Sequence, residues 1–106
     1  MVTELDPRPV AVVVVAASAG GVEALTGFVG ALPRRFAGVV LVILHIPDAG
    51  PSLLPDILAR SGELPVVQAR EGTPLRRSLV VVAPPGQHLR VRDGKAQLDR
   101  GPRENG

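Results

Sequence analysis

Ser18 and His45 are the residues whose types and positions could carry out nucleophilic chemistry. Ser18 follows a run of valines and alanines and precedes a turn of small residues. A serine hydroxyl becomes a nucleophile when a sharp strand-to-helix turn exposes it beside amide groups that hold the developing oxyanion. The sequence therefore predicts a nucleophile at Ser18, with the oxyanion and substrate contacted by the backbone of Ala19, Gly20 and Gly21.

His45 is the candidate general base. It is one of two histidines and stands directly after a second apolar run, residues 39–44. A base must come within hydrogen-bond reach of the hydroxyl whose proton it takes. If the two runs are neighbouring parallel strands, their carboxyl ends lie at one edge of the sheet, and Ser18 and His45 meet there.

Both residues also have ordinary structural interpretations. An isolated serine before a helix is most often an N-cap, but a capping box needs Glu or Gln where Gly21 stands. Consecutive glycines also weaken a helix start by ~1 kcal/mol each relative to alanine. His45 alone could be a partly buried histidine with satisfied hydrogen bonds, and His88, close to Pro84-Pro85-Gly86, is interpreted as structural.

Other glycine-loop chemistries fit less well. A dinucleotide fingerprint needs glycines where Ala16 and Ser18 stand, and a P-loop needs a Lys-Ser or Lys-Thr pair that the sequence lacks. The chain has no cysteine, which excludes thiolate metal sites and disulfides. We therefore expect no cofactor and no metal.

Composition points to one α/β domain. The chain has 106 residues, 45% of them hydrophobic and 2% aromatic, so its core must be built from Val, Leu, Ile and Ala. The net charge is +2, and we expect the pairs Arg76-Arg77 and Arg90 with Arg92 to be solvated. Without a clustered basic face and aromatic stacking platforms, nucleic-acid binding is not expected.

The sequence predicts a cytoplasmic protein without membrane insertion. The longest apolar run, residues 10–17, is far shorter than the ~20 residues that a membrane helix requires. The first residues lack the basic region of a signal peptide, and the absence of cysteine suits a reducing compartment.

Hydrophobic periodicity predicts alternating strands and helices followed by a hairpin. The runs of β-branched residues are typical of strands buried in a parallel sheet. Ser52 is a suitable N-cap, Pro55 is tolerated in a first turn, and Gly62 can end the helix. The expected strands are 10–17, 39–44, 65–68 and 78–83, the expected helices 22–32 and 52–62, and the antiparallel hairpin 88–98 turns at Asp93-Gly94.

Several segments follow one another in the order of a known family. They are Ala17-Ser18-Ala19-Gly20-Gly21 with Glu23-Ala24-Leu25, Leu32-Pro33, Val42-Ile43-Leu44-His45-Ile46-Pro47, Ala69-Arg70-Glu71-Gly72, Val82-Ala83-Pro84-Pro85-Gly86 with His88-Leu89, and Gly101-Pro102 with Asn105. In this respect the chain resembles the CheB-type chemotaxis protein-glutamate methylesterase catalytic domain.

The resemblance implies a fold and an activity. The fold is α/β, a doubly wound, mostly parallel sheet in a Rossmann-like three-layer arrangement with helices on both faces, here with a C-terminal antiparallel hairpin. The activity is hydrolysis of glutamate methyl esters on methyl-accepting chemoreceptor proteins, with deamidation of receptor glutamines in some members. Ser18 would match the nucleophile of the family and His45 its base.

The resemblance covers only the front of that domain. The triad aspartate of the family lies in a Gly-Met-Gly-x-Asp-Gly-like motif that residues 1–106 do not contain, and Asp93 belongs to the hairpin turn instead. We therefore expect one partial domain, without the receiver domain that often precedes it. Losing the aspartate of a Ser-His-Asp unit removes ~10⁴-fold in turnover. The alternative is a non-catalytic binding or regulatory module whose glycine-rich helix start holds an anion.

Overall fold

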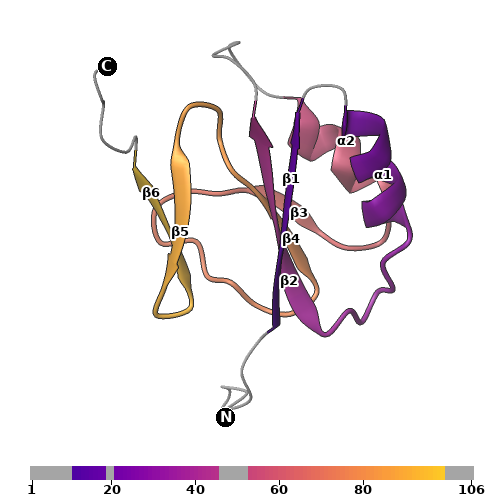
Figure 1. Ribbon diagram of the computed structural model, residues 1–106. Helices are drawn as coiled ribbons and strands as arrows, with labels where there is room; N and C mark the ends of the chain where they lie inside the picture. Colours follow the sequence, from indigo (N-terminus) through magenta and orange to yellow (C-terminus); the bar gives the residue numbers. More distant parts are fainter. Residues whose placement is uncertain (1–10, 19–20, 46–52, 100–106) are drawn as a thin grey trace.

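The computed structural model describes residues 11–18, 21–45 and 53–99, with the backbone alone described at 17, 18, 44 and 45 (Figure 1). Strands and helices alternate as far as β3, β4 follows without a helix between, and a hairpin comes last, in the order that the sequence predicts. The elements are β1 (Ala11–Ser18), α1 (Val22–Gly30), β2 (Gly38–His45), α2 (Leu54–Ser61), β3 (Val66–Gln68), β4 (Leu79–Val82), β5 (His88–Arg92) and β6 (Lys95–Asp99).

The first four strands form a parallel sheet in the order β1-β2-β4-β3. The connections β1-α1-β2 and β2-α2-β3 step across the sheet in the same direction. Because such crossovers are right-handed, both helices lie on one face. The chain then steps back from β3 to β4, so its connection, residues 69–78, crosses the other face.

The helical face holds one hydrophobic core. Alternate residues of the central strands point toward the helices, because successive side chains in a strand face opposite sides of the sheet. The buried residues of this core are Leu25, Val29, Val40, Val42, Leu54, Leu58, Leu64, Val80 and Val82. The 3.6-residue period that predicts helix 22–32 therefore corresponds to residues that face the sheet.

The opposite face holds a second core under the hairpin. The buried residues there are Val39, Leu41, Ala69, Leu75, Leu79, Val81 and Ala96. Figure 1 shows the β5–β6 hairpin across the sheet from α1 and α2. The expected three layers are present, but in the described part of the chain the second outer layer is a hairpin with the β3–β4 connection, where the resemblance implied helices.

Backbone hydrogen bonds attach this hairpin to the rest of the fold. The Gly72 amide donates to the Ala96 carbonyl, the Ala96 amide donates to Thr73, and the Leu75 amide donates to Gly94, each at 2.8 Å. The β3–β4 connection thus pairs along the outer edge of β6. At the hairpin tip Asp93 and Gly94 both have positive φ, 54° and 73°, which is the geometry of a type I′ turn.

Neither helix begins at a residue whose side chain caps it. The N-cap of α1 is Gly21 and that of α2 is Leu53, and neither makes a side-chain capping bond. Ser52, the predicted cap, lies outside the described residues and one position before the observed one. Pro55 occupies the first turn of α2 as predicted. Within the described ranges, neither helix is long and apolar enough to cross a membrane.

The helices come into close contact at their carboxyl ends. A Cβ atom placed on Gly30 would lie 2.6 Å from the Ser61 carbonyl oxygen, and one placed on Gly62 would lie 2.7 Å from the Val29 oxygen. The backbones approach this closely because neither glycine carries a side chain. This contact fixes α1 against α2 on the helical face of the sheet.

Candidate functional site

Strands β1 and β2 bring the backbones of Ser18 and His45 side by side. The strands are parallel and paired over their whole length, from Ala11 opposite Gly38 to Ser18 opposite His45. Neighbouring strands lie about 5 Å apart, so the two Cα atoms are direct neighbours. The prediction that the two runs are adjacent parallel strands is therefore confirmed.

Gly21, and not Ser18, is the N-cap of α1. Its φ of −93° and ψ of 6° precede the helix that starts at Val22. Ser18 is the last residue of β1, three positions before this cap, so the interpretation of Ser18 as an ordinary helix N-cap is wrong. Ala19 and Gly20, the other predicted oxyanion residues, lie outside the described residues.

The start of α1 provides a positive electrostatic end next to this strand edge. The first amides of a helix have no partner within the helix, and its macrodipole favours negative charge there. Among the residues that the structure describes, no side chain makes a capping hydrogen bond to these amides. The exposed carboxylate of Glu23 lies in the first turn, where negative charge stabilises a helix.

An open pocket of about 250 Å³ lies between β1 and α1. Sequence reasoning did not identify it. Ala16, Gly21 and Ala24 are small and leave space beside the larger apolar residues, which is the signal that could have indicated it. The lining residues are Val15, Ala16, Gly21, Ala24, Leu25 and Phe28. All are apolar, so the pocket suits an aliphatic group and has no side chain that could bind a charge.

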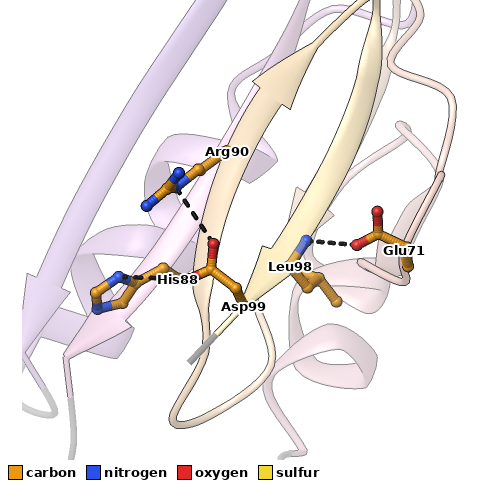
Figure 2. A network of polar contacts seen from close by, with 5 residues as sticks. All are labelled: Glu71, His88, Arg90, Leu98 and Asp99. Atoms are coloured by element: carbon orange, nitrogen blue, oxygen red, sulfur yellow. Dashed lines mark hydrogen bonds and ion pairs between the residues drawn. The ribbon is translucent and has the colours of Figure 1, made fainter. Parts of the chain in front are cut away.

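His88 belongs to the hairpin and not to the β1–β2 edge. It begins β5, and its Nδ1 lies 4.0 Å from Oδ1 of Asp99 on β6 (Figure 2). Both side chains are largely exposed. The structural interpretation of His88 therefore agrees with its place in a surface pair.

Strand β1, helix α1 and strand β2 form a strand-helix-strand unit of a parallel α/β sheet, with a serine and a histidine paired at the ends of the two strands. The sequence profile of the CheB methylesterase family matches residues 13–106. The chain belongs to this family.

Relatives and a solved structure agree with this assignment. A protein-glutamate methylesterase/protein-glutamine glutaminase of Anaeromyxobacter dehalogenans is 41% identical over 93 residues, 88% of this chain and 27% of that protein. The protein-glutamate methylesterase FrzG of Myxococcus xanthus is 34% identical over 97 residues, 91% of this chain and 29% of that protein.

The CheB methylesterase catalytic domain of Thermotoga maritima superimposes with a TM-score of 0.72 at 27% identity. The superposition covers 86% of this chain and 49% of that one. The chain thus spans about a quarter of the curated relatives it matches and about half of this catalytic domain.

Proposed function

We propose that this chain provides the nucleophile and the general base of a protein-glutamate methylesterase, a carboxylic ester hydrolase. The observation that carries the proposal is the register of β1 with β2, in which Ser18 and His45 are paired at the ends of adjacent parallel strands. The uncapped start of α1 follows Ser18 within four residues. Family membership and the names of the relatives support the same activity.

The proposed reaction proceeds through an acyl-enzyme. Ser18 Oγ attacks the carbonyl carbon of a glutamate methyl ester while His45 takes the hydroxyl proton. The tetrahedral intermediate expels methoxide, which receives that proton and leaves as methanol. Water then gives a proton to His45 and attacks the acyl group. The second tetrahedral intermediate expels the Ser18 oxygen, which takes that proton from His45, and the released glutamic acid ionises to its carboxylate.

The oxyanion of each tetrahedral intermediate needs hydrogen-bond donors. We propose that backbone amides of Ala19, Gly20 and Gly21 hold it, supported by the uncapped N-terminus of α1. The same machinery would deamidate a glutamine with ammonia as the leaving group. We propose methyl-accepting chemoreceptors as the protein substrates, chemotactic signal transduction as the process, and the cytoplasm as its location.

A third residue is needed to orient the imidazole. The aspartate motif expected from the family is not among the 106 residues. A missing aspartate costs ~10⁴-fold in turnover, because nothing then fixes the tautomer and orientation of the histidine. We therefore propose that full activity requires Ser18, His45 and an aspartate together. The aspartate would come from the other half of the catalytic domain.

A fluorophosphonate probe tests the nucleophile. We expect the probe to label Ser18 in a catalytic domain that includes these residues, and peptide mass spectrometry should locate the adduct. Ser18→Ala should abolish labelling. Ser61→Ala is the matched control, because the Ser61 hydroxyl donates to the Ile57 carbonyl within α2 and is remote from β1 in the sequence.

Two outcomes would contradict the proposed methylesterase activity. Equal labelling of the wild type and Ser18→Ala would exclude Ser18 as the nucleophile. Absent labelling, combined with anion binding that depends on Gly21, would favour the non-catalytic module in which the start of α1 only holds a negatively charged group.

A further inference from the structure

The outward face of the β5–β6 hairpin carries a concentration of basic side chains. Cross-strand pairing places residues of one face opposite one another: His88 with Asp99, Arg90 with Gln97, and Arg92 with Lys95. The alternate residues Ala96, Leu89 and Leu98 pack toward the sheet. We call these six outward residues the basic hairpin face: His88, Arg90, Arg92, Lys95, Gln97 and Asp99.

Only one acidic residue belongs to this face. The Asp99 carboxylate lies 3.4 Å from Arg90 Nε and 4.0 Å from His88 Nδ1 (Figure 2). Arg92 and Lys95 stand directly opposite each other, and in the described part of the chain neither forms an ion pair. Like charges directly across two strands destabilise a hairpin. This part of the face therefore reduces hairpin stability instead of adding to it.

The basic hairpin face is held rigidly. Besides the backbone bonds to residues 72–75, the Leu98 amide donates to Glu71 Oε1 at 2.8 Å (Figure 2). Ala96 is fully buried under the face. Arg90 is 62% exposed, as expected for a solvated residue. A rigid, exposed surface whose cations repel one another is also suited to bind an external anion.

The hairpin starts on the side of the sheet where Ser18 and His45 lie. β4 is parallel to β2, which is parallel to β1, so all three strands end at the same edge. Residues 83–87 connect β4 to β5, and in Figure 1 this connection passes from the carboxyl end of the sheet to the top of the hairpin. The basic hairpin face thus extends away from the edge of the proposed active site.

We propose that the basic hairpin face docks an acidic helix of the substrate protein, the segment that carries the glutamates next to the esterified one. This inference rests on the proposed function for the identity of the partner. Successive outward residues of a strand are about 7 Å apart, and helix positions i and i+4 are about 6 Å apart. Arg90 and Arg92 therefore match two glutamates one helical turn apart.

The lack of aromatic side chains on the hairpin favours a polypeptide over a single-stranded nucleic acid. Both kinds of partner bring negative charge, but single-stranded nucleic acids also need aromatic side chains on which bases stack. The two aromatic residues of the chain, Phe28 and Phe36, lie in α1 and the α1–β2 turn and not on the hairpin. Carboxylates on a protein helix need only the exposed cations.

The test measures binding of the chain to a synthetic helical peptide with glutamates at i and i+4, compared with the glutamine version. Arg92→Glu places a carboxylate opposite Lys95, so it removes the like-charge pair and leaves folding favoured. Lys95→Glu does the same from the other strand. We expect each to weaken binding of the glutamate peptide about five- to tenfold at low salt. The difference should shrink at high salt.

Arg35→Glu is the matched control. Arg35 is exposed like Arg92, but it lies in the α1–β2 turn, just before the amino end of β2, and not on the hairpin. Its peptide affinity should stay near that of the wild type. Equal weakening by Arg35→Glu, no change in Arg92→Glu, or equally tight binding of single-stranded DNA would overturn the proposal. Fluorophosphonate labelling of Ser18 is measured in parallel in a catalytic domain that also contains the aspartate motif, so hairpin-dependent binding without labelling there would refute only the proposed function.

Discussion

The close contact between the carboxyl ends of α1 and α2 predicts that two identical substitutions in one helix have opposite effects. Gly27 and Gly30 both lie in α1. Nothing lies within 4 Å of a Cβ placed on Gly27, whereas a Cβ on Gly30 would be 2.6 Å from the Ser61 carbonyl oxygen. Helix propensity alone predicts that alanine is stabilising at both positions.

The magnitudes follow from these distances. Gly27→Ala should raise the free energy of unfolding by ~0.5–1 kcal/mol, because alanine loses less backbone entropy than glycine. For Gly30→Ala, a carbon–oxygen contact of about 3.3 Å requires the helices to separate by roughly 0.7 Å. Overpacking of this kind costs ~1–3 kcal/mol, which exceeds the propensity gain. With that gain of ~0.5–1 kcal/mol subtracted, Gly30→Ala should lower the free energy of unfolding by about 0–2.5 kcal/mol, and by about 1 kcal/mol at the middle of both ranges.

Urea unfolding followed by far-ultraviolet circular dichroism measures both variants against the wild type. The slope of the unfolding free energy with urea should stay constant, because both variants expose the same surface on unfolding. If Gly30→Ala were as stabilising as Gly27→Ala, the helices could not be in backbone contact at this point, and the packing described for the helical face would be wrong.

Two further substitutions test the core and the outer strand. Leu58 is fully buried in the core under the helices, so Leu58→Ala should lower the free energy of unfolding by ~2–5 kcal/mol in the same urea assay. Val14 is 57% exposed on β1, which pairs on one side only within the described residues. We expect this open strand edge to pair with a second copy of the chain. Val14→Lys should prevent that pairing by adding charge, and Ile57→Lys on α2 should not, as sedimentation velocity would show. If the Val14→Lys variant self-associates as much as the wild type, the edge of β1 does not mediate pairing between copies of the chain.

Local patterns predicted most of the secondary structure. The β-branched runs predicted strands within one residue of their observed ends. The burial that the same pattern predicts is wrong for β1, where Val12 and Val14 are 45% and 57% exposed because the strand lies at the end of the described sheet. Asp93-Gly94 predicted the hairpin turn because both residues tolerate positive φ. The pairing of Ser18 with His45 followed from the rule that consecutive parallel strands in such units lie side by side.

Local sequence patterns did not predict the order of the strands or the position of the hairpin. Nothing in the short β3 and β4 sequences indicates that β4 lies between β2 and β3, because that order depends on how the connection 69–78 packs. The hairpin as an outer layer depends on the pairing of Gly72 with Ala96, a contact between separate segments. The start of α2 after Leu53 also differs from the serine cap expected one residue earlier.

The ladder between β1 and β2 limits how the chain can be engineered or can vary in length. It is continuous over eight residues of each strand and places Ser18 opposite His45 at its last step. One residue inserted into either strand would displace its end by about 3.3 Å and reverse the faces of all later side chains. Insertions in the α1–β2 turn, residues 31–37, would leave this alignment intact. Length changes are therefore expected to be tolerated in the turn and excluded from the two strands.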